Sequence, residues 1–251
     1  MKMKNKKIFT MLLASTFIFA GCSNNQQKEK TNTESQTIMN ENKEEVVQDN
    51  KEVSQEINYK FYIDKDGKAV KKEDIGDRIV LHWFTDPNCS GCVHVNTATF
   101  EHKAEYLGDD AVIEQNMVAF EGDYSKLASS YIVAVNTIDP ELAPAYYDRI
   151  INEHFFKFME ISKDNAFKET YEQLGGTKWN EVEKIRPEAE KVVNANTEDF
   201  LNNPEYIEKS PFDYVFTPFV YSDENGKAIE FTSDKDLVET LREDIEKAIS
   251  K

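Results

Sequence analysis

Two cysteines three positions apart, Cys89 and Cys92, are the residues of this sequence with the clearest capacity for chemistry. They follow an apolar run, Ile79 to Phe84, of the kind found in buried strands, and a short polar loop. If a helix begins at Cys89, positions i and i+3 lie on one face, so the two sulfurs can meet. The first sulfur then lies at the helix N-terminus, where unpaired N–H groups and the helix dipole favour a thiolate. Such a thiolate can attack a disulfide and be released by forming a disulfide with its partner.

The hydrophobic pattern around the cysteines predicts the elements that hold them. Alternating apolar residues from Tyr59 to Ile63, followed by the turn residues Asp64 to Gly67, indicate an edge strand or hairpin. Beyond the cysteines the sequence is compatible with a helix to about Leu107, with Gly108 as its C-cap. A second short strand is expected from Met117 to Phe120. We therefore expect a strand, a helix and a second strand joined by a right-handed crossover.

The middle of the chain, residues 125–203, has a mainly helical pattern. Gly175 and Gly176 indicate a break, and Pro187 is expected to open a further helical stretch, because proline is favoured in the first turn of a helix. We interpret this segment as an all-helical insertion rather than as a separate domain with chemistry of its own.

Strand character returns after Pro204. The runs Phe216 to Tyr221 and Ala228 to Phe231 flank an Asn-Gly turn, which is a strong hairpin signal. The last stretch, from Leu237 to Ala248, carries apolar residues at helical spacing and is predicted to be an amphipathic helix.

The N-terminus has the features of an export signal. Residues 1–7 are basic and residues 8–19 are uncharged, a stretch too short to span a bilayer comfortably. The following Ala20-Gly21-Cys22 resembles a bacterial lipobox, although Phe19 stands where that pattern usually has leucine. The resemblance implies removal of residues 1–21, a lipid on the Cys22 sulfur, and attachment to the outer face of the cell membrane. An ordinary secretory signal and an uncleaved anchor are the alternatives.

Composition limits the remaining possibilities. Residues 22–58 are rich in polar residues and poor in large apolar ones, so we expect a disordered linker between the lipid and the folded part. The formal net charge of −17 argues against binding of nucleic acid by the folded part. There are only three cysteines, and with Cys22 predicted to be lipidated a scaffold stapled by several disulfides is excluded.

Two separated motifs carry a resemblance to a known family: the loop from Phe84 to Cys92, and the segment from Phe216 to Val220 with its Thr217-Pro218 pair. In this order, and with a helical block between them, they resemble a thioredoxin fold with a helical insertion, as in the DsbA-like thiol:disulfide oxidoreductases. The implied fold is α/β, with a central mixed sheet flanked by helices. Residues 59–124 and 204–251 would form the thioredoxin-like domain, and residues 125–203 the insertion.

The resemblance also implies roles for residues. In that family the proline that matches Pro218 is cis and faces the cysteine pair, and an X–Pro bond adopts the cis form at modest cost. A substrate strand could pair with the exposed backbone of Thr217, so Thr217 and Pro218 are the candidate substrate-binding residues. Cys89 is the expected nucleophile and Cys92 the resolving thiol.

These roles lead to a functional hypothesis. We expect a membrane-anchored thiol:disulfide oxidoreductase that forms disulfides in exported or cell-surface proteins, with no cofactor and no metal. The expected partners are cysteine-containing substrates, a redox partner and the membrane, which is reached through the lipid on Cys22, and the expected state is a monomer.

The direction of the reaction stays open in the sequence. Ser90 and Gly91 stand where the family commonly carries proline, an aromatic residue or histidine, and they add no charge that would stabilise a thiolate. Asp86 would oppose a thiolate if its side chain pointed inward. A reductase or isomerase is therefore an alternative to an oxidase.

Other kinds of site are also compatible with the residues. Zinc could nominally bind Cys89, Cys92, His94 and His102, but His94 is too close to Cys92 for the usual ligand spacing and is expected to face solvent. A purely structural disulfide would close a tiny loop and stabilise little. A non-enzymatic surface lipoprotein that keeps a thioredoxin-like frame is the alternative from another functional class.

Overall fold

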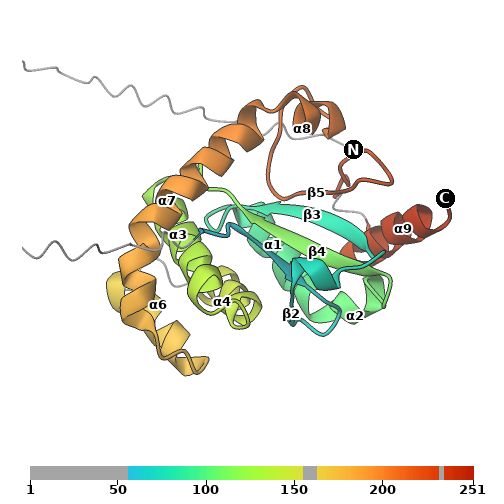
Figure 1. Ribbon diagram of the computed structural model, residues 1–251. Helices are drawn as coiled ribbons and strands as arrows, with labels where there is room; N and C mark the ends of the chain where they lie inside the picture. Colours follow the sequence, from blue (N-terminus) through green and yellow to red (C-terminus); the bar gives the residue numbers. More distant parts are fainter. Residues whose placement is uncertain (1–55, 155–162, 232–234) are drawn as a thin grey trace, which may run out of the picture. The chain divides into compact units, whose positions relative to one another are not determined.

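The computed structural model describes residues 56–154, 163–231 and 235–251 (Figure 1). The predicted signal peptide, Cys22 and the linker as far as residue 55 lie outside these ranges. Within them, none of the helices combines the length and the apolar character that crossing a bilayer would require.

A five-stranded mixed sheet forms the centre of the fold, in the order β2–β1–β4–β3–β5. Strand β3 pairs in parallel with β4 and antiparallel with β5, while β1 pairs antiparallel with both β4 and β2. The strands are β1 (Lys60–Ile63), β2 (Ala69–Val70), β3 (Ile79–Thr85), β4 (Ala111–Met117) and β5 (Phe219–Ser222). The central position predicted for the Ile79 to Phe84 run is confirmed, and the N-terminal hairpin forms with β2, rather than β1, at the sheet edge.

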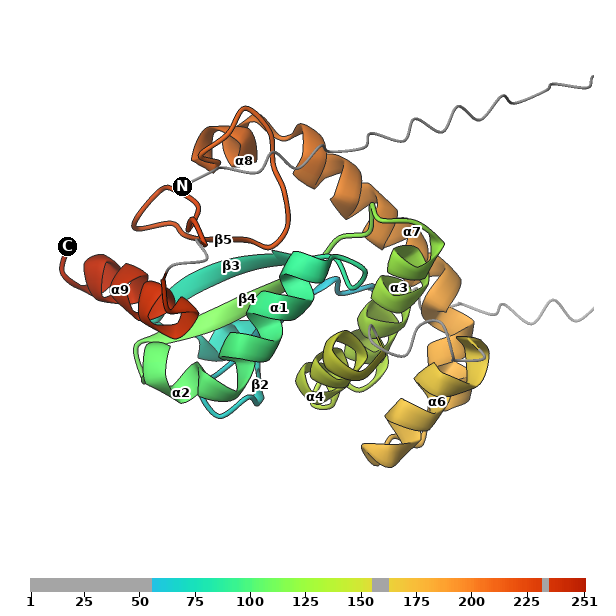
Figure 2. The same cartoon turned by 180° about the vertical axis from the view of Figure 1, so that it is seen from behind.

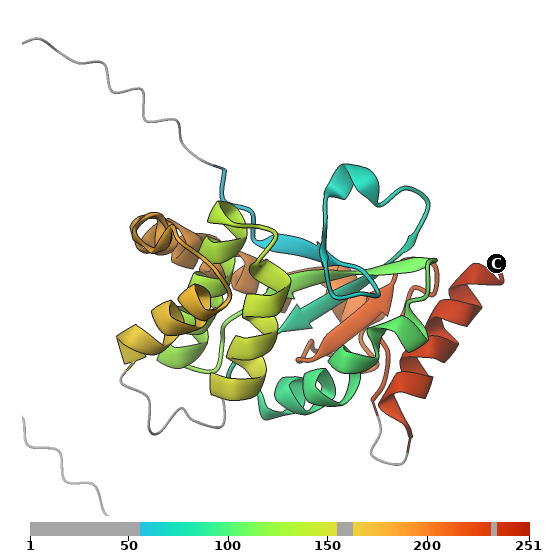
Figure 3. The ribbon, with the colours of Figure 1, turned by 90° about the horizontal axis from the view of Figure 1, so that it is seen from below.

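Helices pack on the sheet and beside it. Figure 2 shows α1 and α2 lying across one face of the sheet, and Figure 3 shows α3, α4, α6 and α7 grouped at one end with α9 at the other. The helices are η1 (Lys72–Asp74), α1 (Ser90–Thr99), η2 (Phe100–His102), α2 (Lys103–Tyr106), α3 (Asp123–Ile138), α4 (Ala143–Arg149), the π-helical turn η3 (Ile150–His154), α6 (Lys163–Gln173), α7 (Trp179–Asn202), α8 (Pro204–Lys209) and α9 (Leu237–Ile249).

The two faces of the sheet bury different residues, because side chains alternate along each strand. Leu81, Trp83 and Val220 belong to the main apolar core, together with residues of α1 and α9. On the opposite face Phe84 and Phe219 belong to a second, aromatic cluster with rings from α7 and α8. The strand that leads to Cys89 is therefore anchored on both faces.

The second strand of the parallel pair lies earlier in the chain than the sequence suggests. We predicted Met117 to Phe120, whereas β4 spans Ala111–Met117 and every one of its residues is buried. Its three polar residues interrupt the apolar pattern from which a strand is predicted, but the side chain of each makes a hydrogen bond inside the fold. The Gln115 side chain, for example, donates to the Trp83 carbonyl at 3.2 Å.

Two proline-based predictions of helix boundaries are wrong. Pro187 lies inside α7, which starts eight residues earlier at Trp179. The α7 helix packs along α3, and the Tyr131 hydroxyl donates to Glu183 at 2.6 Å, so tertiary contacts outweigh the loss of one backbone donor. Pro204, after which strand was expected, is the first residue of the short helix α8, where its missing N–H costs nothing.

The C-terminal hairpin is reduced to a short contact. Strand β5 is regular, but its predicted partner, Ala228 to Phe231, forms only an isolated bridge between Ala228 and Tyr221 and a bond from Ile229 N to Val220 O at 2.7 Å. The Ala228 N–H instead donates to the Lys209 carbonyl at the end of α8. The predicted final helix is present as α9, with Asp236 as its N-cap.

A buried ionic cluster crosses the sheet. The Glu114 carboxylate on β4 accepts from Lys60 Nζ at 2.9 Å, from the Tyr62 hydroxyl at 2.7 Å and from His82 Nδ1 at 2.9 Å, while His82 Nε2 lies 3.2 Å from Asp223. Burial alone would lower the pKa of His82, but the hydrogen bond and charge of Glu114 outweigh it and the pKa is raised. His82 is therefore structural, as the sequence suggested.

This cluster predicts a pH-dependent stability. A raised pKa means that the folded state prefers protonated His82, so its contribution is present below the ordinary value of 6.5 and is lost as the pH rises through the folded-state pKa. Urea unfolding between about pH 5.5 and 8.5 should show wild type losing stability relative to His82→Gln, by at most about 1.4 kcal/mol per pH unit. The comparison isolates His82 because the other groups titrate in both proteins. Parallel pH curves for the two proteins would contradict the prediction.

Candidate active site

Cys89 and Cys92 meet at the beginning of α1, as the spacing predicted. Cys89 is the N-cap residue, and its sulfur accepts a hydrogen bond from the Cys92 backbone N–H at 3.2 Å. Both residues are free thiols, with 6% of Cys89 and 2% of Cys92 exposed. The structure is thus that of the reduced pair, with the Cys89 sulfur directed at the unpaired N–H groups of the first helical turn.

The loop before β5 covers the sulfur from the other side. The Thr217–Pro218 peptide bond is cis, as expected, and the Cys89 thiol donates to the Thr217 carbonyl at 3.3 Å. A Cβ atom at Gly91 would lie 3.5 Å from Pro218 Cδ, so the start of α1 packs directly on the proline ring. The structure therefore brings together all four residues predicted for the site.

The two thiols differ strongly in acidity. The hydrogen bond with the Cys92 side chain lowers the pKa of Cys89 to about 7 against the opposing effect of burial, and the Thr217 side chain and the Cys92 N–H assist. Burial and the adjacent Cys89 raise the pKa of Cys92 well above its ordinary value. Near neutral pH, Cys89 can therefore exist as a thiolate while Cys92 keeps its proton. This is the asymmetry that a nucleophile and a resolving thiol require.

The acidity of Cys89 can be measured directly. We expect its alkylation by iodoacetamide to rise with pH around a midpoint of about 7, while Cys92 stays unreactive until much higher pH. In Cys92→Ala the strongest stabilising hydrogen bond is lost, so the midpoint should move upward. Mass spectrometry of a Cys22→Ser chain after timed quenching would report each thiol separately. An unchanged midpoint in Cys92→Ala would show that the helix terminus alone sets the acidity.

Asp86 has a different role from the one considered in the sequence. Its fully buried carboxylate accepts from the N–H groups of Asn88 at 2.8 Å, Phe120 at 2.9 Å and Glu121 at 3.0 Å, and from the Ser125 hydroxyl. It thus joins the loop before α1 to the loop between β4 and α3. The acid whose charge opposes the Cys89 thiolate is Glu121, which the sequence did not single out.

The helical segment contributes a residue behind the pair. Tyr147 of α4 is fully buried, and its hydroxyl lies 3.4 Å from the Thr85 hydroxyl at the end of β3. Burial raises the pKa of Tyr147, and the nearby Cys92 adds to the rise. Nothing in the sequence pattern marks Tyr147, because it resembles any other aromatic residue on a helix face.

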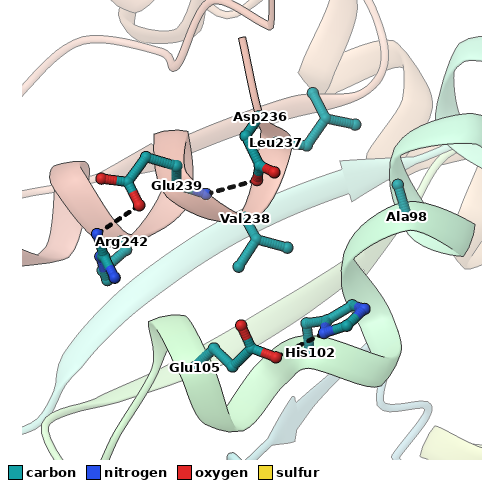
Figure 4. A pocket seen from close by; sticks show the side chains of 8 residues that line it. All are labelled: Ala98, His102, Glu105, Asp236, Leu237, Val238, Glu239 and Arg242. Atoms are coloured by element: carbon teal, nitrogen blue, oxygen red, sulfur yellow. Dashed lines mark hydrogen bonds and ion pairs between the residues drawn. The ribbon is translucent and has the colours of Figure 1, made fainter.

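The histidines considered as metal ligands lie elsewhere. His94 is exposed, and His102 Nδ1 lies 2.6 Å from Glu105. Across the part of the chain that the structure describes, no three His, Cys, Asp or Glu side chains are grouped in a way that could hold a metal ion. His102 and Glu105 instead line a cavity of about 320 Å³ facing the start of α9 (Figure 4). None of the four predicted site residues lines that cavity.

The mixed sheet, its flanking helices and the cysteine pair at the start of α1 define a thioredoxin fold of the DsbA type, which confirms the predicted fold class. No protein-family model and no curated protein matches the chain. Among solved structures it is similar to MdbA, a thiol-disulfide oxidoreductase from Corynebacterium diphtheriae, with a TM-score of 0.55 and 18% identity over 76% of this chain and 96% of that one.

Two further structures share the fold. Reduced DsbA from Mycobacterium tuberculosis has a TM-score of 0.54 and 15% identity over 77% of this chain and 98% of its own. Oxidised BdbD from Bacillus subtilis has a TM-score of 0.52 and 18% identity, with coverages of 70% and 90%. At these identities the likeness defines the fold, and the chemistry must be argued from the site.

Proposed function

We propose that this chain is an extracytoplasmic thiol–disulfide oxidoreductase, anchored to the outer face of the cell membrane through Cys22, that forms disulfides in exported proteins. The observation that carries the proposal is the Cys89 sulfur, held between the Cys92 N–H and the Thr217 carbonyl beside cis-Pro218. A disulfide with a purely structural role would need neither a first thiol of lowered pKa nor a backbone segment such as Thr217-Pro218 placed against its sulfur.

The reaction follows from the acidity of the two thiols. In the oxidised pair a substrate thiolate attacks the Cys89 sulfur, the Cys89–Cys92 bond breaks, and Cys92 leaves as a thiolate that takes up a proton. A second substrate thiolate then attacks the substrate sulfur of the mixed disulfide and releases Cys89. Two electrons and two protons pass from the substrate dithiol to the pair, and a disulfide-bearing redox partner must then re-oxidise it.

The acidity of Cys89 also favours a second candidate. A pKa of about 7 is near that of thioredoxin and far above the value of about 3.5 for a strong oxidant. With little thiolate stabilisation to favour the reduced state, the same site can reduce substrate disulfides when a partner supplies electrons. The reverse steps are chemically identical, so only the reduction potential decides the direction.

The reduction potential of the Cys89–Cys92 pair tests both candidates. Equilibration of the Cys22→Ser chain with glutathione buffers, followed by alkylation and mass spectrometry, gives the value. A potential well above roughly −200 mV supports an oxidase, whereas one near about −270 mV assigns the reductase role. Failure of the pair to exchange with glutathione at all would overturn the proposed function. Labelling of Cys22 by a fatty-acid analogue in cells tests the anchor separately.

A further inference from the structure

Exposed aromatic rings gather in the loop that leads to cis-Pro218, whose neighbour Thr217 contacts Cys89 through its carbonyl. Five large apolar side chains are exposed in the described residues, and two of them, Phe212 and Tyr214, lie in the loop that leads to cis-Pro218, while Phe120 lies in the loop tied to Asp86. Exposure reaches 61% at Tyr214 and 46% at Phe212. Exposed apolar side chains that gather at a reactive site indicate a binding surface.

The rings before Pro218 form an ordered strip. The rings of Phe212 and Tyr214 are stacked with centroids 5.6 Å apart, and Phe212 meets Phe216 edge-on at 5.4 Å. The Ser210 hydroxyl fixes the loop by accepting from the Phe212 N–H at 3.2 Å and donating to the Tyr214 carbonyl at 2.7 Å. We call Phe212, Tyr214 and Phe216 the aromatic strip. Because it is held in place, binding to it costs little ordering entropy.

The strip leads directly into the backbone that holds Cys89. Phe216 is followed by Thr217, whose carbonyl accepts a hydrogen bond from the Cys89 thiol. The Phe216 ring also contacts Phe219 of β5. A peptide bonded through its cysteine to Cys89 and lying along this loop would pass over the strip. Side chains on one face of an extended peptide recur about every 6.6 Å, close to the spacing of the rings. Alternate residues of such a peptide would therefore each meet a ring.

Acidic side chains predominate in the segments that meet near the cysteine pair. Residues 86–92, 118–125 and 210–218 contain no lysine or arginine, and Lys126 and Lys209 directly flank two of these segments. The segments themselves carry exposed carboxylates at Glu121, Asp123 and Asp213. A basic residue in the substrate would be attracted here, and it would also lower the pKa of the substrate cysteine and so increase its thiolate fraction.

We propose that the aromatic strip selects extended, cysteine-containing segments that carry aromatic side chains two and four positions from the cysteine together with a lysine or arginine. This inference rests on the proposed function and specifies its substrates. The partner is an unfolded segment rather than a folded surface, because only an extended backbone can follow residues 212–217 while its cysteine reaches Cys89, a residue that is only 6% exposed.

The test measures how fast Cys89 attacks activated peptides. Synthetic peptides carry one cysteine as a mixed disulfide with thionitrobenzoate, so attack by the Cys89 thiolate forms the enzyme–peptide disulfide and releases the coloured thiolate. The peptides have phenylalanine or alanine two and four positions from the cysteine, on its N-terminal or C-terminal side, and lysine or glutamate beside it. The protein is the full chain with Cys22→Ser, and Ellman's reagent serves as the small disulfide.

On one side of the cysteine, N-terminal or C-terminal, phenylalanine should make the peptide react with wild type about tenfold faster than its alanine counterpart does. In the Phe212→Ala/Tyr214→Ala variant this ratio should fall below about twofold, and Asp213→Lys should abolish or reverse the preference for lysine over glutamate. Ile249→Ala, which removes a similarly exposed side chain from the end of α9, should keep the full ratio. Should the double variant prove unstable, Tyr214→Ser alone must still lower the ratio.

A preference that survives the double variant, or is absent from wild type, would overturn the proposed selection. Failure of the proposed function gives a different result. In that case wild type would react no faster than Cys89→Ala with Ellman's reagent as well as with every peptide.

Discussion

Replacing Cys89 by alanine is expected to slow disulfide formation in a reduced, unfolded substrate by on the order of a thousandfold or more. The reason is the division of roles between the thiols. Cys89 alone lies at the helix terminus with a pKa of about 7, while Cys92 is almost completely buried and has a raised pKa. Without Cys89 the pair cannot form the disulfide that a substrate thiolate attacks, and the buried Cys92 sulfur cannot replace it. Refolding of a reduced disulfide-containing protein, followed by recovery of its activity, measures the rate.

Cys92→Ala provides the matched comparison, because it removes the other sulfur and leaves the nucleophile. Given a substrate that already contains a disulfide, this variant should attack it through Cys89, release one substrate thiolate and keep the other substrate sulfur in a mixed disulfide, which persists because the Cys92 thiol that would resolve it is absent. Non-reducing gels should show the adduct with Cys92→Ala and not with Cys89→Ala. Equal refolding rates for wild type and Cys89→Ala would refute the assignment of the nucleophile.

The sequence was sufficient to predict the parts of the site whose chemistry is local. The spacing of Cys89 and Cys92 after a buried strand determines their place at the start of α1, and the step from β3 into that helix needs no knowledge of distant contacts. Thr217-Pro218 was found through the resemblance to the DsbA-like family, in which a proline after a strand-like run follows an upstream cysteine pair. Both motifs depend on residue types that have few other uses at such positions.

The parts that were missed depend on contacts across the fold. Strand β4 is buried with three consecutive polar residues, and Glu114 fits there only because Lys60, Tyr62 and His82 meet it from neighbouring strands. Pro187 stays helical because α7 packs along α3. Such partners lie tens of residues away in sequence, so a local pattern does not reveal them.

Asp86 shows how the same limit affects the site itself. From the sequence it was an acid three residues before the nucleophile, with a charge that could oppose the thiolate. In the fold its carboxylate is fully buried and engaged by three N–H groups and a hydroxyl. Its partners Phe120 and Glu121 lie in the loop between β4 and α3, and Ser125 lies in the first turn of α3. Asp86 therefore determines where Glu121, whose charge acts on Cys89, is placed.

Asp86→Ala is accordingly expected to lower the free energy of unfolding by about 3 kcal/mol. Four donors would lose their carboxylate acceptor, and the hydroxyl of the fully buried Ser125 would be left without water to replace it. Asp86→Asn should lose about half as much, since the amide oxygen still accepts while its NH₂ group faces donors. Urea unfolding followed by tryptophan fluorescence measures both. Asp123→Ala, which removes an exposed acid at the first residue of α3, is the control and should cost less than about 1 kcal/mol.

The same variants separate a structural effect from an effect on the nucleophile. If Asp86 fixes the loop that carries Glu121, its loss releases that carboxylate from the neighbourhood of Cys89, and the alkylation midpoint of Cys89 should fall below that of wild type, because Glu121 raises the pKa. Glu121→Gln removes the same charge without disturbing the loop, so it should lower the midpoint while leaving the unfolding curve nearly unchanged. An Asp86→Ala protein with wild-type stability and a wild-type alkylation midpoint would show that the four hydrogen bonds of Asp86 neither stabilise the fold nor affect the pKa of Cys89.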